Sequence, residues 1–306
     1  HSRMQESYPS RTALRVALRR AAHQLYDACP LVLADPIAVP ILGPYAEELS
    51  RTPGRTPHYR RPGNRAPQPK ERPFSIALRA FLVARSRYAE DQLALAVARP
   101  SVPPLTQYVV LGAGLDTFAH RNPHPRLRVF EVDHPSTQQW KRELLASTSL
   151  PTPSNLTYVP LDFESHTFGQ QSLPAALAAA GYNPHLPTFF AWLGVVPYLT
   201  LPAFRATLGF IAAQPPGSGL VFDYGQPRHA LPPLEQLAHD SLAARVQLAG
   251  EPFRLFFTPR EAAAELAAFY DLEDLGSSEI NKRYFDQRTD SLRTLGSAGR
   301  LLSAWL

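Results

Sequence analysis

The sequence predicts an α/β protein whose core is a mostly parallel, doubly wound sheet. Short apolar runs alternate with stretches of helical period through the middle of the chain, and a glycine-rich turn, Gly112-Ala113-Gly114, directly follows the first run. This alternation is typical of parallel strands joined by crossover helices. Such sheets bind ligands beyond the carboxyl ends of their strands, so we expect the glycine turn to line a ligand site.

Five apolar runs predict the strands of this sheet, at 106–111, 126–132, 156–161, 188–194 and 217–225. Stretches of helical period between them predict helices at 135–147, 173–181 and 201–213. A further helix is expected after Thr258, because Thr258 and Glu261 can form a capping box around a proline at the first helical position.

The N-terminal third is expected to be helical. We divide the chain into a helical cover, residues 1–100, and a ligand-binding core, residues 101–306, with a helical insert at 226–256 that forms a lid. In the first helix Leu14, Leu18, Ala21 and Leu25 share one face. A basic amphipathic helix can lie on a membrane, but a helix that packs on the domain is the favoured interpretation.

The net charge of +5 is concentrated in one segment. Residues 51–72 hold seven Arg or Lys and one Glu among many Pro and Gly, which predicts a loop. Acids and bases nearly cancel elsewhere, and no basic surface with interleaved aromatic residues is apparent, so we expect no nucleic-acid partner. The basic loop either stays a solvated loop or closes over an anionic ligand.

Several other classes of protein are disfavoured. The chain has a single cysteine, Cys29, which cannot form a disulfide within the chain or a metal site built of several thiolates. No apolar run approaches the roughly 20 residues of a membrane helix. The N-terminal residues lack the apolar region of a signal peptide, so we expect a cytoplasmic protein with no membrane partner. His120 and His124 have a spacing seen in metal sites, but Pro123 interrupts any helix there and no carboxylate cluster joins them, so no metal is expected.

The glycine turn suggests a specific kind of ligand. Gly112 and Gly114 lack a Cβ, so a ligand can approach the main chain, although the same residues could simply make a tight turn. The third glycine of the dinucleotide fingerprint is missing, and Asp116 would repel a pyrophosphate while attracting an ammonium group. Asp133 ends the second strand about 20 residues further on, where an acid can accept hydrogen bonds from ribose; it could instead cap the next helix. A nucleoside with an amino-acid tail, S-adenosylmethionine (SAM), satisfies all these features.

The same residues, with others along the chain, resemble the leucine carboxyl methyltransferase family of class I SAM-dependent methyltransferases. The resemblance is strongest to the bacterial branch, which includes O-methyltransferases of secondary metabolism, and it implies a Rossmann-like sheet. The matching segments are 10–14, 35–43, 83–93, 109–117, 129–135, 194–200, 251–261 and 281–285.

The resemblance implies a cofactor role for each matching position. Arg85, rather than Arg87, would bind the methionine carboxylate. The turn Gly112-Ala113-Gly114 would line the methionine moiety, Asp133 with its neighbour His134 would hold the ribose, and Asp162 with Phe163 would frame the adenine. Where the family often has a Glu before Gly-Val, this chain has Leu193, which removes an acidic contact near the cofactor.

The catalytic residues are less clearly indicated. Trp192 and Tyr198 could place aromatic faces near the sulfonium, although ordinary core is the favoured interpretation of each. An ionised carboxylate acceptor needs no base, whereas a phenol or alcohol would benefit from one. We name His229, just past the fifth strand, as the candidate base, although an ordinary loop histidine is the favoured interpretation. Tyr198 and Arg283 are further candidates.

Together these features predict a SAM-dependent O-methyltransferase that acts on a carboxylate or hydroxyl of a small molecule, which can be anionic. The acceptor pocket is expected between the N-terminal helices, the basic loop and the insert. Three alternatives stay open: a SAM-binding protein of the same fold without methyl transfer, a nicotinamide-dependent oxidoreductase, and methylation of a protein carboxyl terminus. The sequence leaves the oligomeric state open.

Overall fold

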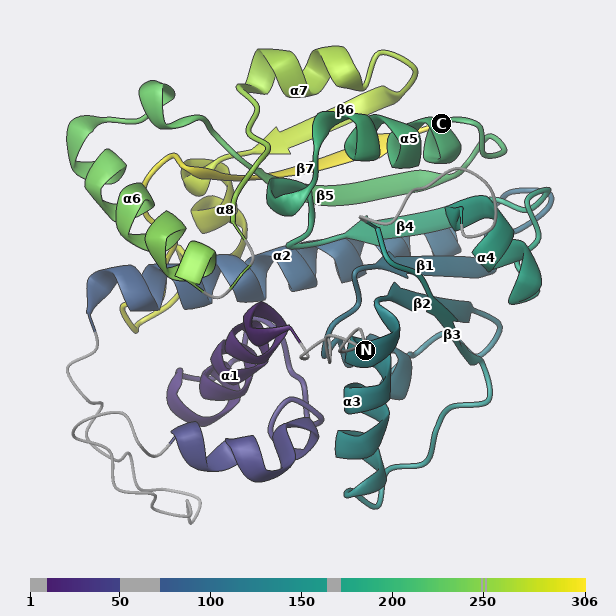
Figure 1. Cartoon of the computed structure of the whole chain (residues 1–306), viewed down its shortest axis with the longest axis horizontal. Coiled ribbons are helices and arrows are strands. Elements are labelled where there is room, and N and C mark those ends of the chain that lie inside the picture. The colour runs from purple at the N-terminus through teal and green to yellow at the C-terminus, as the bar shows by residue number, and fades with distance from the viewer. Residues whose placement is uncertain (1–9, 50–71, 164–171, 249, 251) are drawn as a thin grey trace, which may run out of the picture.

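The computed structural model describes residues 10–49, 72–163, 172–248, 250 and 252–306. A seven-stranded sheet with the order β3-β2-β1-β4-β5-β7-β6 forms the centre of the molecule (Figure 1). Its strands are β1 (Gln107–Leu111), β2 (Arg128–Asp133), β3 (Leu156–Pro160), β4 (Thr188–Trp192), β5 (Gly219–Gly225), β6 (Tyr270–Leu275) and β7 (Gly299–Trp305). The first five pair in parallel, as the sequence predicts, which confirms the fold class.

The last two strands complete the sheet through antiparallel pairs, and β7 alone runs opposite to the other strands. β7 pairs antiparallel with β5 and with β6, which forms an edge of the sheet. Sequence analysis missed both strands. β6 reads YDLEDL and only its last residue is buried, so it lacks the apolar run by which the other strands are recognised.

Helices cover both faces of the sheet, as in a doubly wound fold. On one face α2 (Pro73–Ala98) and α8 (Ser277–Tyr284) pack on side chains that alternate along the strands. On the other face lie α4 (Leu173–Ala179), α5 (Leu201–Ala212) and α7 (Pro259–Glu265), and α7 begins with the predicted capping box. A third apolar cluster joins α1 (Arg11–Tyr26), the short helix η1 (Pro40–Leu49) and α3 (Pro135–Ala146).

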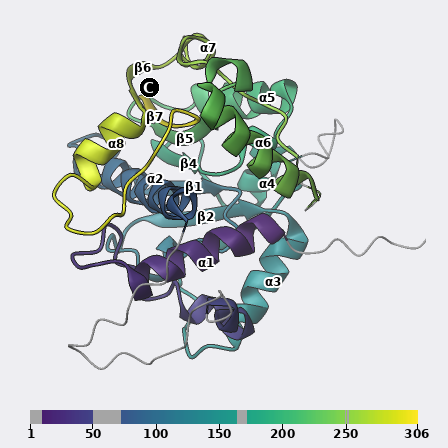
Figure 2. The ribbon, with the colours of Figure 1, turned by 90° about the vertical axis from the view of Figure 1, so that its left-hand side faces the viewer.

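The first helix lies close to the ligand end of the sheet. In Figure 2, α2 is seen nearly end-on and α1 crosses beneath it. The buried face of α1 is centred on Ala17 and Ala21 and includes Arg20, whereas Leu25 is 37% exposed. The predicted face is therefore wrong at its C-terminal end. Small alanines allow close packing there, and the buried arginine is stabilised by acidic partners that hydropathy alone does not reveal.

The insert predicted at 226–256 contains the short helix η4 (Arg228–Ala230) and α6 (Pro233–Leu248). Residues 51–71 of the predicted basic loop lie outside the described residues, so its role as a lid stays a prediction, as does the division into cover and core. Within the described part of the chain, no helix has both the length and the apolar character needed to cross a lipid bilayer.

Candidate functional site

The glycine turn lines a cavity of about 460 Å³ at the carboxyl end of β1. Gly112 and Gly114 both have positive φ, +69° and +51°, which favours glycine strongly. A Cβ on Gly112 would lie 2.2 Å from Val195 Cγ2, and one on Gly114 would lie 3.2 Å from Ala13 Cβ. The two glycines are therefore required by the turn and its neighbours in the protein, and their backbone still forms part of the cavity wall.

Asp133 is held in the same cavity by two main-chain donors. Its Oδ2 accepts a hydrogen bond from the Gly114 N–H at 2.5 Å, and its Oδ1 accepts one from the His134 N–H at 2.6 Å. Burial raises the pKa of Asp133, and the two N–H groups oppose this shift. Asp133 does not cap α3, because the N-cap is His134, whose Nδ1 accepts from the Ser136 N–H. Each carboxylate oxygen keeps further acceptor capacity for a ribose hydroxyl.

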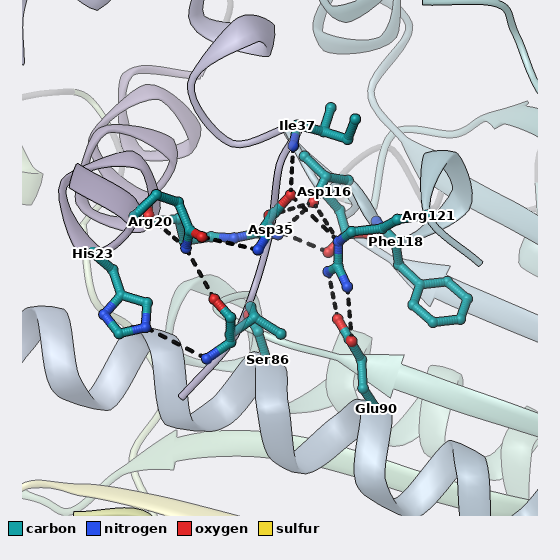
Figure 3. Close-up of polar contacts among 12 residues, drawn as sticks. Arg20, His23, Asp35, Ile37, Ser86, Glu90, Asp116, Phe118 and Arg121 are labelled. Atoms are coloured by element: carbon teal, nitrogen blue, oxygen red, sulfur yellow. Dashed lines mark hydrogen bonds and ion pairs between the residues drawn. The ribbon is translucent and has the colours of Figure 1, made fainter. Parts of the chain in front are cut away.

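Asp116 lies at the cavity within a buried polar network (Figure 3). Its Oδ1 accepts from the Phe118 N–H at 2.8 Å, and its Oδ2 lies 3.5 Å from Arg20 Nη1. Arg20 Nη2 donates to Asp35 Oδ2 and to Thr117 Oγ1, both at 2.7 Å. This network fixes the turn against α1 and the segment that follows it.

Two guanidinium groups keep the centre of this network ionised. Burial alone would raise the pKa of Asp35, but Arg20 and Arg121 outweigh burial and lower it. Arg121 in turn pairs with Glu90 of α2 at 2.5 Å (Figure 3). Sequence analysis did not identify this network. The available signal was that Asp35 opens one of the segments that resemble the family, the stretch DPIAVPILG.

Arg85 reaches the cavity from α2. It is buried on α2, and its Nη1 donates to Asp223 Oδ2 at 3.0 Å. Asp223, at the end of β5, also accepts the Gly194 N–H on its Oδ1 at 2.5 Å. Arg87 is exposed and pairs with Asp91 at 2.7 Å, so α2 presents Arg85 rather than Arg87 to the site, as expected.

Asp223 is a site residue that sequence analysis missed. β4 and β5 pair in parallel with Trp192 opposite Phe222, so the ends of the two strands lie side by side. This chain has Leu193 where the family often has a Glu, but the neighbouring strand β5 places the carboxylate of Asp223 beside Gly194. A strand ending in FDYG gave the only signal.

Most of the residues predicted to bind the cofactor meet in this one cavity. Its wall includes Arg85, Gly112, Ala113, Gly114, Asp116, Asp133, His134, Asp162, Phe163 and Leu193. Carboxylates, a guanidinium and bare main chain are thus together in one cavity, and these groups can pair with the ammonium, carboxylate and ribose of SAM. The residues present fit SAM, and the volume falls within the roughly 300–1,000 Å³ of typical small-molecule pockets.

Trp192 was wrongly placed at the cofactor. Its side chain is fully buried in the core on the other face of the sheet, where its ring stacks on Phe204 with centroids 5.3 Å apart. Ala191 and Leu193 line the cavity instead. The reason is strand alternation, which turns the residue between them to the opposite face.

Two of the three predicted catalytic residues also lie elsewhere. His229 is exposed on η4 and lines neither cavity described here. Arg283, on α8, is likewise outside both: it pairs with Glu273 at 2.5 Å, and its guanidinium lies over the Tyr88 ring at 5.3 Å. Position along the chain placed both near the correct end of the sheet, but the loop and the helix that carry them turn the side chains away.

A second cavity, of about 530 Å³, adjoins the first. The two share five lining residues, Thr12, Val16, Arg85, Gly194 and Tyr198. Its remaining wall comes largely from apolar and aromatic side chains of α2, α6 and the segment after α6, among them Phe81, Leu242, Phe253 and Phe256. Of the predicted catalytic residues, only Tyr198 lines this wall. His239 and Arg15, which sequence analysis did not single out, also line it.

Comparison with known proteins assigns the chain to a family. The family model of the leucine carboxyl methyltransferases matches residues 13–212. The proposed S-adenosyl-L-methionine-dependent methyltransferase YktD of Bacillus subtilis is 30% identical over 314 aligned positions, which cover 94% of this chain and 95% of YktD. A proposed methyltransferase of the same type from Mycobacterium sp. (strain KMS) is 32% identical over 264 positions, 83% of this chain and 79% of that protein.

Solved structures agree on the fold. A DUF574-family protein from Streptomyces avermitilis matches with a TM-score of 0.52 and 19% identity, covering 76% of this chain and 85% of that one. A proposed methyltransferase from Thermobifida fusca matches with a TM-score of 0.51 and 19% identity, covering 75% and 82%. The family model over residues 13–212, together with the relatives from Bacillus subtilis and Mycobacterium, shows that the chain belongs to the leucine carboxyl methyltransferase family and is a SAM-dependent methyltransferase.

Proposed function

We propose that this enzyme transfers the methyl group of SAM to an oxygen atom, of a carboxylate or a hydroxyl, on a small molecule bound in the second cavity. The observation that carries the proposal is that the two cavities share a wall of five residues. Bound SAM supplies an electrophilic methyl group on a sulfonium. A cofactor in the first cavity and an acceptor in the second would meet at this shared wall, between α1, α2 and the end of β4.

The lining residues have distinct roles in this proposal. Asp133 accepts hydrogen bonds from the ribose, and Arg85 binds the carboxylate of the methionine moiety while Asp223 holds its guanidinium in place. Asp116 pairs with the ammonium group, and Asp162 with Phe163 contacts the adenine. Gly194 allows this arrangement, because a Cβ there would lie 2.7 Å from Arg85 Nη2.

The walls of the second cavity support a small, largely apolar acceptor. Apolar side chains from α2 and α6 line this cavity. Around a bound acceptor they would exclude water, which favours methyl transfer. Arg15 and Arg19 of α1 also line this cavity, so an acceptor with an anionic substituent would find a favourable charge there. We place the reaction in the secondary metabolism of the cytoplasm, in keeping with the bacterial relatives that the sequence resembles.

The test is methyl transfer from isotopically labelled SAM to a panel of phenols and carboxylic acids, with products identified by mass spectrometry. We expect labelled ethers or esters from the wild-type enzyme and strongly reduced product from Arg85→Lys, which loses the planar guanidinium. Arg87→Lys is the matched control two residues away on the same helix, and it should behave as the wild type. Tight SAM binding without transfer to any oxygen acceptor would contradict the proposal.

A further inference from the structure

The second cavity contains a histidine whose ring has unused hydrogen-bonding capacity. His239 lies on α6, and both of its ring nitrogens are buried without a hydrogen-bond partner among the described residues. Its ring packs against Phe253 and Phe256, with centroids 6.4 and 5.4 Å apart. Asp240 Oδ1 lies 3.7 Å from Nδ1, beyond hydrogen-bond distance. Asp240 is itself held by Arg228 at 2.8 and 2.9 Å.

Three other polar groups around this cavity are already paired within the protein. The Tyr224 hydroxyl donates to Asp274 at 2.6 Å, the Gln226 amide donates to the Ser297 carbonyl at 2.7 Å, and the Ser277 hydroxyl donates to the Gly296 carbonyl at 2.6 Å. Buried polar atoms without partners are uncommon because leaving them unpaired is costly. An unpaired imidazole on an aromatic wall therefore indicates a place for a polar group of the ligand.

A second unpaired group lies where the two cavities meet. Thr12 Oγ1 is buried without a hydrogen-bond partner among the described residues, and Thr12 lines both cavities. Tyr198, which shares that wall, packs against Phe253 with ring centroids 5.4 Å apart, and Phe253 packs against His239. Aromatic rings thus line the wall from the shared boundary to the imidazole. A flat aromatic acceptor matches this surface better than a flexible aliphatic one.

We propose that the methyl acceptor is a phenol and that His239 is the base that receives its proton; this rests on the proposed O-methyl transfer. The phenol hydroxyl donates a hydrogen bond to His239. Its oxygen forms the new bond to the methyl carbon while the carbon–sulfur bond breaks, with the bonding pair left on sulfur. The hydroxyl proton passes to the imidazole and then to water. A carboxylate acceptor is already ionised near neutral pH, so it has no proton for this imidazole to accept.

One probe carries both acceptor groups on a single ring. Given para-hydroxybenzoate and methyl-labelled SAM, the enzyme can form an ether at the hydroxyl or an ester at the carboxylate, and only the ester releases labelled methanol in alkali. We expect the ether. His239→Gln should lower its rate of formation about 100-fold or more, the range typical of a lost general base. His229→Gln, an exposed histidine on η4, is the matched control and should retain the wild-type rate.

Binding gives a readout that does not depend on turnover. Calorimetry with para-cresol, which keeps its phenolic proton at neutral pH, and the protein saturated with S-adenosylhomocysteine should show about three- to tenfold weaker binding in His239→Gln, for one lost hydrogen bond, with unchanged affinity for S-adenosylhomocysteine. His239→Asn is the second variant if the first fails to fold. Ester formation, or ether formation and phenol binding that do not depend on His239, would overturn the inference and leave the proposed O-methyl transfer standing. Absence of transfer to every oxygen acceptor would contradict the proposed function itself.

Discussion

Replacing Gly112 by alanine tests how the cofactor turn is built. The residue has φ +69°, and a methyl group there would lie 2.2 Å from Val195 Cγ2. The left-handed backbone costs alanine about 1–2 kcal/mol. Relieving the clash costs about 1–3 kcal/mol more, as is usual for overpacking. The turn can move only slightly away from Val195, because the Gly112 N–H donates to the Val132 carbonyl at 2.8 Å.

A double-mutant cycle separates the two costs. In a Val195→Ala background Cγ2 is gone, and Val195 Cβ lies 3.5 Å away, an ordinary contact. Gly112→Ala should then cost only the backbone contribution, so urea denaturation should give a coupling free energy of about 1–3 kcal/mol between the two substitutions. If the two effects add to within about 0.5 kcal/mol, the clash does not constrain the turn and this reasoning is refuted.

Three further predictions concern residues around the site. Trp192→Phe should lower the free energy of unfolding by about 1–3 kcal/mol and leave the affinity for S-adenosylhomocysteine unchanged in calorimetry; a large loss of affinity would mean that the indole does face the cofactor. Arg283→Gln should change stability by less than about 1 kcal/mol and leave turnover intact, and a loss of turnover in a folded variant would restore it as a catalytic candidate. Asp35→Asn should cost about 3–5 kcal/mol at neutral pH, because it leaves Arg20 buried beside a neutral partner. The lowered pKa of Asp35 means that its contribution is present above the ordinary value of 3.8 and is lost as the pH falls below it. Urea denaturation at neutral and acid pH should therefore show a weaker dependence in the variant than in the wild type, and equal slopes would contradict the assignment.

The central part of the fold and the cofactor cavity could be predicted because their signals are local. A buried parallel strand is a short apolar run, and the residues that follow it must lie at one edge of the sheet. This geometry placed Gly112, Gly114, Asp116 and Asp133 together without knowledge of the rest of the chain. The error at Trp192 was avoidable, because alternation along β4 already separates it from Leu193.

The rest of the site depends on packing between distant segments. Asp223 joins Arg85 across 138 positions, and Thr12 and His239 reach one cavity from α1 and α6. No motif or residue spacing in the sequence predicts that these distant residues lie close together. His229 was chosen because it follows a strand, but the chain after Gly225 turns outward and exposes it. The edge strand β6 was missed because an exposed strand needs no apolar run.

The central claim is that Asp133 and Arg85 bind the same cofactor molecule. Titration calorimetry with S-adenosylhomocysteine tests this claim most directly. Asp133→Asn replaces a charged acceptor by an amide of the same shape, and hydrogen bonds to charged groups contribute about 1.5–3 kcal/mol. We predict dissociation constants about 10- to 100-fold above the wild-type value for Asp133→Asn, a marked increase for Arg85→Lys, and no change for Arg87→Lys. Wild-type affinity in folded Asp133→Asn and Arg85→Lys proteins would contradict the account.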